Sequence, residues 1–139
     1  MPVFFGVDQT LRVLRIIHGT FIVTVFLYLY VLSIVPHQPA DIAPSMYWGL
    51  VAIAFFALLA ALFVRKRMVG VALERLRVAP DDAAALGNWR KFGILACALL
   101  ETIALFGFSL RILGADWAHV APFFVVAVGT LLLTFPQRP

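Results

Sequence analysis

The residue of this sequence best placed to do chemistry is a single carboxylate inside a long apolar stretch. Glu101 lies in ALLETIALFGFSL, residues 98–110, where every neighbour over several positions is apolar or small, except Thr102. A charged acid at the centre of a membrane helix costs about 2.5–3.5 kcal/mol on insertion scales. We therefore expect Glu101 to be protonated, paired or turned toward other helices, and a neutral, hydrogen-bonded acid is the form we favour.

The neighbours of this carboxylate can be sought among polar residues at the same depth. Thr24 in the first apolar run and Thr130 in the last should lie level with Glu101, whereas Thr102 points about 100° away around the helix. Arg111 lies ten residues further on, about 15 Å along the axis, which is too far for a direct ion pair. His18 lies near the start of the first apolar run, at its predicted cytoplasmic end, and could reach Glu101 only through water.

Three histidines could in principle bind a metal or haem. His37 and His119 both fall on the same predicted side of the membrane and could meet, but a zinc site wants three or four ligands, and only Asp41 and Asp116 lie nearby in the sequence. We expect ordinary interfacial histidines there, and a packed, hydrogen-bonded His18. Neither a metal nor a cofactor is predicted.

Other catalytic signals are absent from the sequence. It contains no Walker motif, HExxH or glycine-rich phosphate loop, and no Ser-His-Asp grouping, so we expect no enzymatic activity. Cys97 is the only cysteine, which excludes an intramolecular disulfide and favours a buried thiol used as a small apolar side chain. The net charge of +4 does not indicate nucleic-acid binding, because the basic residues flank the apolar runs.

Composition and hydropathy place these residues in a membrane protein. The chain has 139 residues, of which 63% are hydrophobic and 13% charged, with a mean hydropathy of +1.01. Soluble domains are about half apolar and about a quarter charged. Four apolar runs approach the roughly 20 residues of a spanning helix, and helices are the form that satisfies the backbone in lipid. The predicted spans of this single domain are about 14–35, 45–64, 92–114 and 118–135.

The fourth span contains a proline, and aromatic residues flank several spans. Pro122 falls in the first helical turn if that helix begins near Ala121, where proline is tolerated. A belt of aromatic side chains near one membrane surface is the simplest account of Tyr28, Tyr30, Tyr47, Trp48 and Trp117.

The basic residues predict the orientation in the membrane. Arg12 and Arg15 precede the first span, seven Lys and Arg residues lie in the predicted loop 65–91, and Arg138 follows the last span. The other two connections carry no Lys or Arg. By the positive-inside rule both termini and the loop 65–91 are cytoplasmic in a multi-pass protein of the cell inner membrane. Arg111 is the exception, and its side chain can extend outward to the interface.

The predicted loop 65–91 has helical patterning of its own. Residues 68–78 have apolar positions at helical spacing, so this segment either lies on the membrane surface or extends the second span. The sequence APDDAAALGNW then predicts a turn into a short helix, capped by Asp81 or Asp82.

The chain also matches itself at a shift of 78 residues. Residues 12–44 align without a gap on 90–122, and nine of those 33 positions are identical, including the pairs Arg12/Arg90 and Pro44/Pro122. This pattern predicts a duplicated two-helix hairpin. Both copies would have the same orientation, so the axis relating them would run along the membrane normal.

The stretch around Glu101 resembles the ion-carrying helix of ATP synthase c subunits, the proteolipids of rotary ATPases. Their order of a glutamate, a small residue, two residues, then Ile or Leu, an aromatic and a glycine is matched here by Glu101, Thr102, Leu105, Phe106 and Gly107. The resemblance implies that Glu101 binds a proton or ion, with Thr102 as a hydrogen-bond helper. Together with Thr24, placed by depth, these residues form the candidate ion-binding site.

The resemblance covers about 13 residues, and the rest of the chain departs from it. Proteolipids pair this helix with a glycine-rich one, whereas the second span here has only Gly49, and the loop that follows it is much longer than the short polar loop of a c hairpin. These departures argue against a ring-forming rotor. The whole chain is also similar to small four-span bacterial membrane proteins of unknown function, which implies no activity.

The sequence therefore predicts an all-α integral membrane four-helix bundle with both termini cytoplasmic. For function, two classes remain open. The first is a non-enzymatic subunit or accessory protein of a larger membrane complex, whose partners are the lipid bilayer and other membrane subunits. The second is a proton- or ion-binding, proteolipid-like protein that uses Glu101. A homo-oligomer is an open alternative.

Overall fold

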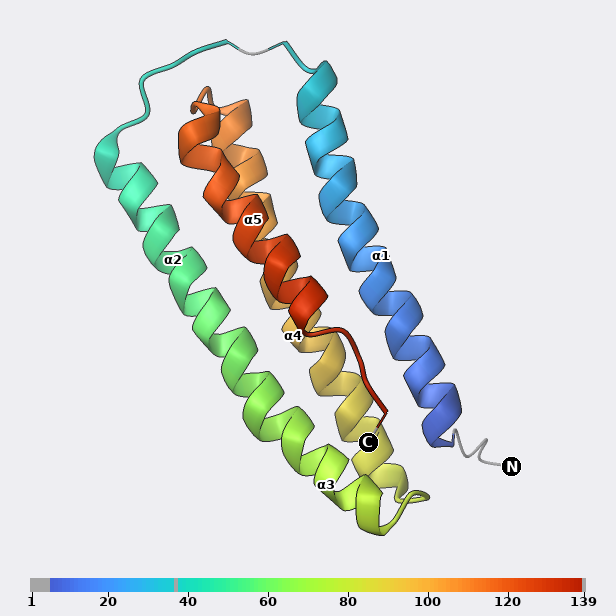
Figure 1. The fold of residues 1–139 in the computed structure, drawn as a ribbon. Helices are drawn as coiled ribbons and strands as arrows, with labels where there is room; N and C mark the ends of the chain where they lie inside the picture. The colour runs from blue at the N-terminus through green and yellow to red at the C-terminus, as the bar shows by residue number, and fades with distance from the viewer. Residues whose placement is uncertain (1–5, 37, 139) are drawn as a thin grey trace.

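The computed structural model describes residues 6–36 and 38–138, and all the regular secondary structure in these residues is helical. The elements are α1 (Val7–Ile34), α2 (Pro44–Phe63), the π-helix η1 (Val64–Val69), α3 (Gly70–Val78), α4 (Ala83–Ile112) and α5 (Trp117–Leu133). Because α2, η1 and α3 follow one another without a break, they form one rod, and the chain folds into four rods that run up and down (Figure 1). The predicted all-helical bundle is confirmed.

Three of these rods are long and apolar enough to cross a membrane. They are Val7–Ile34, Pro44–Val78 and Ala83–Ile112, with 28, 35 and 30 residues, whereas α5 has 17 residues. At 1.5 Å per residue the three long rods measure about 42, 52 and 45 Å, against a hydrocarbon thickness of about 30 Å. Each is therefore longer than the bilayer core is thick.

The segment 65–91, predicted to connect the second and third spans, is helical except at residues 79–82. Of the two alternatives for residues 68–78, the structure shows the extension of the second span, with the π-helix η1 at the junction. Lys and Arg are good helix formers, so a basic run need not end a helix. At the turn, Asp82 is the N-cap of α4, where its carboxylate accepts hydrogen bonds from Ala84 N at 3.0 Å and Ala85 N at 3.1 Å.

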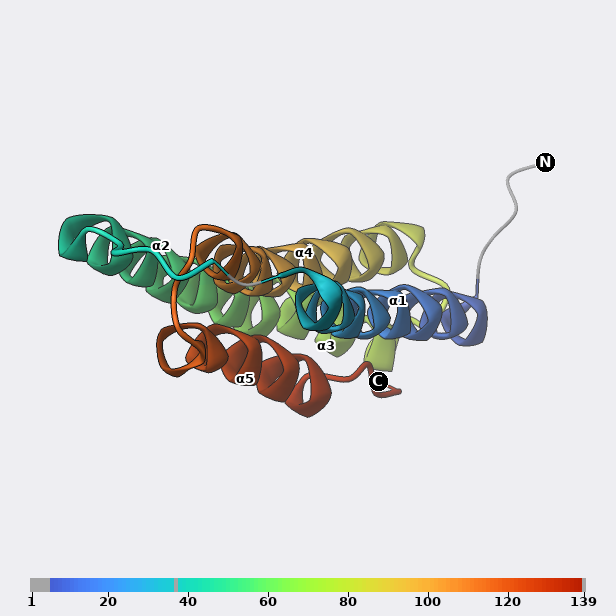
Figure 2. The same cartoon turned by 90° about the horizontal axis from the view of Figure 1, so that it is seen from above.

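α4 is the central rod of the bundle. It packs against every other rod, while α1 and α2 lie on opposite sides of it (Figure 2). Its buried positions recur every three or four residues, which is the spacing of a helix face; they are Ala85, Leu86, Trp89, Ala96, Cys97, Leu100, Ile103, Ala104, Gly107 and Leu110. α1 and α4 run in the same direction, and α2 and α5 run in the opposite one (Figure 1).

The core has two parts. A central cluster joins all four rods around Leu100, Ile103 and Phe123. A terminal cluster lies at the end of the bundle that carries the N-terminus, where α1, η1, α3 and α4 meet, and consists of Leu11, Leu14, Val69, Ala72, Leu76, Ala85, Leu86 and Trp89. No residue of α5 belongs to the terminal cluster, so this end of the bundle is built from three rods.

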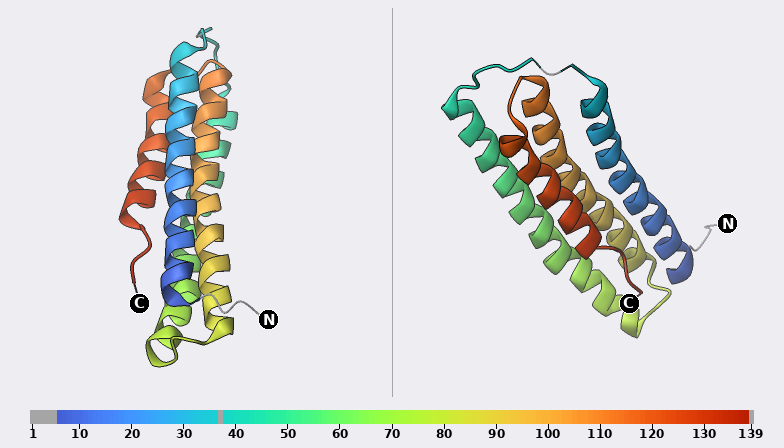
Figure 3. Two further views of the ribbon diagram at one scale, coloured as in Figure 1. Left: turned by 90° about the vertical axis from the view of Figure 1, so that its right-hand side faces the viewer. Right: turned by 45° about the horizontal axis from the view of Figure 1, so that its top comes forward.

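α5 stops well short of that end (Figure 3). Its first residue is Trp117, so Pro122 lies in the second turn and not in the first, contrary to the sequence prediction. Beyond Leu133 the chain continues without regular structure toward the start of α1, where Arg138 Nη2 lies 3.0 Å from Asp8 Oδ1 in an exposed ion pair. The gap left by the short helix is therefore spanned by an extended segment.

Close packing of α4 against α5 depends on a glycine. A Cβ on Gly107 would lie 2.8 Å from the Cβ of Phe123 and 3.2 Å from Cε2 of Phe124. Contacts this short involve the Cβ atom of a neighbouring helix, so they can be relieved only if the two helices move apart. Gly107 is the glycine of the proteolipid-like motif, and here its position is explained by packing within the chain.

We expect Gly107→Ala to lower the free energy of unfolding by about 1–3 kcal/mol, as overpacked core substitutions do. The loss should appear although alanine is the better helix former by about 1 kcal/mol. Gly129→Ala in α5 is the matched control, because a Cβ there has nothing within 4 Å and should leave stability unchanged or raise it. Unfolding of both variants in detergent measures the difference, and equal stabilities would contradict the packing role.

Candidate functional site

The membrane carboxylate lies at the seam between α1 and α4. Glu101 is half-buried, and its Oε1 accepts a hydrogen bond of 2.8 Å from the hydroxyl of Tyr28. Helical side chains lean toward the N-terminus of their own helix, so the long tyrosine reaches back about one turn to the level of Glu101. The ring of Tyr28 is held by Phe108, with ring centroids 5.3 Å apart. Glu101 of α4 is thus hydrogen-bonded to a side chain of α1.

The two threonines of the candidate ion site bond elsewhere. The hydroxyl of Thr24 donates to Thr20 O at 2.9 Å, and that of Thr102 donates to Ala98 O at 2.9 Å. Each hydroxyl therefore satisfies a carbonyl one turn back in its own helix. The structure brings Glu101 together with Tyr28, and it shows no hydrogen bond from Thr24 or Thr102 to the carboxylate.

The Glu101–Tyr28 pair can bind and release a proton at the carboxylate while the hydrogen bond between the two side chains is kept. A phenol hydroxyl can donate to a carboxylate or to the carbonyl oxygen of a neutral acid, so the pair is satisfied in both protonation states of Glu101. Among the described residues, no group of three or more His, Cys, Asp or Glu side chains could hold a metal ion.

A second polar site lies deeper, between α1, α4 and α5. His18 is 1% exposed, its Nε2 lies 2.6 Å from Leu131 O, and its Nδ1 lies 3.1 Å from Cys97 Sγ. A carbonyl only accepts, so Nε2 carries the proton and donates to Leu131 O. In the neutral imidazole Nδ1 then accepts from the thiol of Cys97. His18 is packed and hydrogen-bonded, as predicted, and Cys97 is buried but also acts as a donor.

These contacts close the C-terminal end of α5. The last four carbonyls of any helix lack partners within it, and in lipid an unpaired carbonyl costs several kcal/mol. Leu131 is one of these four positions, and its carbonyl accepts a close hydrogen bond from His18 of another helix and a longer one, of 3.4 Å, from Thr134 Oγ1. Thr134 Oγ1 donates to Thr130 O at 2.6 Å, and Arg15 Nε donates to Pro136 O at 3.3 Å. The site is therefore a helix cap assembled from two parts of the chain.

The opposite end of the bundle holds the remaining candidates. The ring of His119 packs edge-on against Tyr47, with centroids 5.1 Å apart, beside a cavity of about 470 Å³ that Asp41 and Asp116 also line. The predicted meeting of His119 with His37 involves a residue outside the described part of the chain. Arg111 donates to Ala115 O at 2.9 Å and lies 4.8 Å from the ring of Trp117.

We expect His18→Leu to lower the free energy of unfolding by about 1–3 kcal/mol, because it leaves the Cys97 thiol without its partner and Leu131 O with only the 3.4 Å hydrogen bond from Thr134 Oγ1. His119→Leu is the matched control, since His119 is exposed and such substitutions change stability by about 0.5 kcal/mol or less. Cys97 is the chain's single cysteine, so maleimide labelling reports this site alone. Labelling should be slow in the wild type and in His119→Leu, and faster in His18→Leu; equal rates in all three would refute the cap.

Comparison with known proteins gives no match: neither a family model, nor a curated protein, nor a solved structure matches the chain. What the protein does must therefore be inferred from the residues themselves. The features available are the Glu101–Tyr28 pair, the helix cap at His18, and the surfaces and cavities of the bundle.

Proposed function

We propose that this chain is a non-enzymatic, membrane-embedded subunit or accessory protein of a larger membrane complex. The proposal is supported first by how little of α2 the chain itself covers. Between Pro44 and Phe63 only Ala54 and Ala61 are buried, while Phe55, Phe56 and Phe63 are more than half exposed. Lipid can cover such a face, and so can the helix of another subunit.

The observation that carries the proposal is an apolar groove between α2 and α5. It has a volume of about 220 Å³, with Ile103 of α4 among its lining residues and Val51, Leu58 and Val126 on its sides. Small residues such as Ala54 in the groove allow close approach of another helix, which is how membrane helices associate. A transmembrane helix of a partner subunit is the occupant that we propose.

The orientation with both termini in the cytoplasm belongs to this proposal. The basic residues that predict it lie at one end of the bundle, together with both chain ends and the turn at residues 79–82 (Figure 1). With α5 as the fourth crossing, the protein would be a four-span component of a cell inner membrane. At 17 residues α5 is at the lower limit of a spanning helix.

The proposed duplication of a hairpin is supported by one pair of helices. Under the shift of 78 residues, α4 (Ala83–Ile112) corresponds to residues 5–34, and α1 spans Val7–Ile34, so both helices end at equivalent positions. The second helices differ, because Trp117 of α5 corresponds to residue 39, whereas α2 begins at Pro44. A duplication would therefore be followed by divergence of α2 and α5.

A second candidate function is proton binding at Glu101. It is favoured by the pairing of this membrane carboxylate with a hydroxyl that can accommodate either of its protonation states. The carboxylate has a partner from a different helix, so a change in its protonation would act directly on the contact between α1 and α4.

Photo-crosslinking tests the subunit proposal. Phe55 lines the groove and is 56% exposed, while Phe26 on α1 is 54% exposed and lies outside the groove. With p-benzoylphenylalanine at Phe55, irradiation of the native membranes should give a discrete protein adduct; at Phe26 it should give lipid adducts only. Native mass spectrometry of the complex in mild detergent then identifies the partner. Identical adduct patterns at the two positions would refute the groove as the docking site, and an adduct of the chain with itself would indicate a homo-oligomer.

Reaction with a hydrophobic carbodiimide tests the proton-binding candidate. We expect Glu101 to be labelled, with a rate that falls as the pH rises, because only the protonated carboxyl reacts. Glu74→Gln, which removes an exposed carboxylate, should leave labelling intact, and Glu101→Gln should abolish it together with proton uptake by proteoliposomes. If Glu101 only packs, Glu101→Gln will be nearly silent, since the amide oxygen can still accept from Tyr28.

A further inference from the structure

A cavity of about 270 Å³ lies where the bundle has only three rods. It is enclosed by α1, η1, α3, α4 and the extended segment that follows α5, and residues from Pro136 to Arg138 form part of its wall. His18 and Cys97 border it, but the hydrogen bonds of the His18 ring already occupy both nitrogens. The ligand that this cavity suits is therefore decided by its other polar residues.

The charge of the lining is entirely positive. Arg65, Arg77 and Arg138 all contribute to the wall, and no Asp or Glu does. Arg77 has an exposed partner in Glu74 at 3.3 Å, and Arg138 has one in Asp8 at 3.0 Å. Both of those carboxylates lie outside the cavity lining, so its interior has no negative charge of its own among the described residues.

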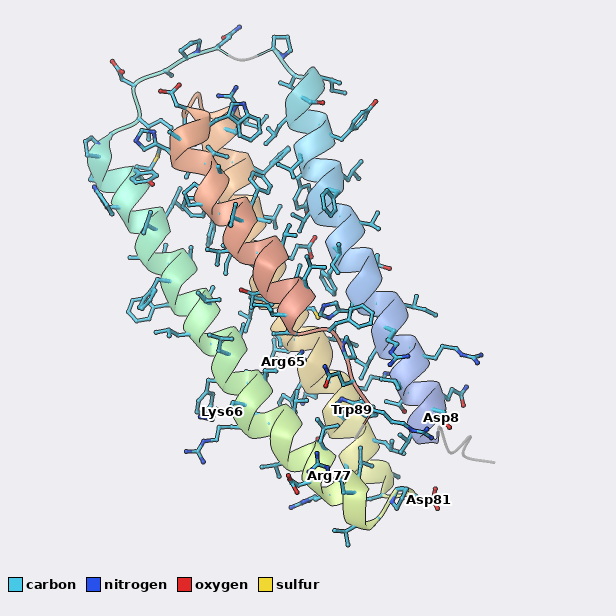
Figure 4. All side chains as sticks on the ribbon, viewed as in Figure 1. Asp8, Arg65, Lys66, Arg77, Asp81 and Trp89 are labelled. Carbon is cyan, nitrogen blue, oxygen red and sulfur yellow. The ribbon has the colours of Figure 1, made fainter. Side chains whose placement is uncertain are left out.

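Arg65 differs from the other two arginines. It is half-buried, and its guanidinium forms no hydrogen bond or ion pair with any described residue. Its neighbours in sequence, Lys66 and Arg67, are exposed. Figure 4 shows Lys66 on the outer side of the rod, while Arg65, Arg77 and Trp89 lie at the same end of the bundle. A partly buried guanidinium offers five fixed donors, which match the oxygens of a phosphate or carboxylate.

The depth of Arg65 places the cavity at a membrane surface. Arg65 follows the first residue of the rod, Pro44, by 21 positions, which is about 32 Å along the helix axis. The hydrocarbon core is about 30 Å thick, so if Pro44 lies near one surface, Arg65 lies near the other, at the level of the headgroups. Basic pockets between transmembrane helices at this level can bind anionic headgroups.

We propose that this cavity binds a phosphate group, with Arg65 as the central ligand and Arg77 and Arg138 at the rim. The group is a phosphodiester of an anionic lipid headgroup or a soluble phosphate, since both present the same oxygens to a guanidinium. In either case the anion would join the rod that contains η1 and α3 to the segment after α5, on the other side of the cavity.

The test uses the full chain, purified in an uncharged detergent and freed of lipid. Binding of dioleoyl phosphatidylglycerol, dioleoyl phosphatidylcholine and inorganic phosphate is measured by native mass spectrometry and by the shift in melting temperature. Arg65→Gln is compared with Arg67→Gln, which removes the same charge from an exposed position two residues away. We expect Arg65→Gln to weaken phosphatidylglycerol binding at least about tenfold, because a hydrogen bond to a charged group is worth about 1.5–3 kcal/mol, and Arg67→Gln to change it less than about twofold.

The arms distinguish the two sources of phosphate. A response to phosphatidylglycerol alone assigns a lipid headgroup, and a response to inorganic phosphate as well assigns a soluble anion. Equal losses in the two variants would overturn the proposal in favour of general attraction to a basic surface. If neither phosphatidylglycerol nor inorganic phosphate binds, the proposal is also overturned. If Arg65→Gln fails to fold, phenylglyoxal labelling of the wild type replaces it. Bound phosphatidylglycerol or phosphate should protect Arg65 but not Arg67 from labelling, and equal protection of the two arginines would overturn the proposal.

Discussion

The structure depends on the need to supply a donor for every backbone carbonyl that a membrane cannot hydrate. Three rods are long enough to meet this need by running past the hydrocarbon on at least one side. α5 does not, because it ends at Leu133, beside the interior of the bundle. Its terminal carbonyls are satisfied by His18 from α1 and by Thr134 from the turn that follows. The buried histidine, the polar cysteine beside it and the extended segment beyond α5 all follow from that early end.

The central position of α4 has a related cause. Without water, membrane helices associate through close packing, which small residues permit. Ala54 and Ala61 of α2 and Ala127 of α5 are buried in the same central cluster as Ala104 of α4. α1 adds a polar contact to this packing, through the hydrogen bond from Tyr28 to Glu101. Small residues, together with the hydrogen bonds that join α1 to Glu101 and Cys97, account for the way the other rods gather around α4.

The sequence was sufficient for the features that depend on local chemistry. Long apolar runs require helices in lipid, and an aspartate before an alanine-rich segment makes a helix cap, as Asp82 does. The partner of Glu101 was missed because depth was compared between backbone positions, whereas Tyr28 reaches back along its helix with a long side chain. Its hydroxyl was a usable signal, since a tyrosine hydroxyl within an apolar run needs an acceptor. The partner of His18 is a backbone carbonyl, which no residue type reveals, and nothing in the basic run distinguishes Arg65 from Arg67.

The cap on α5 also has a consequence for assembly. Synthesis proceeds from the N-terminus, so His18 is already in place when Leu131 is made. Until the two meet, Leu131 O lacks the close donor that His18 supplies. The hydrogen bond from His18 to Leu131 O therefore joins the first and last helices of the bundle, and it forms only once α5, the last helix to be made, has packed against α1.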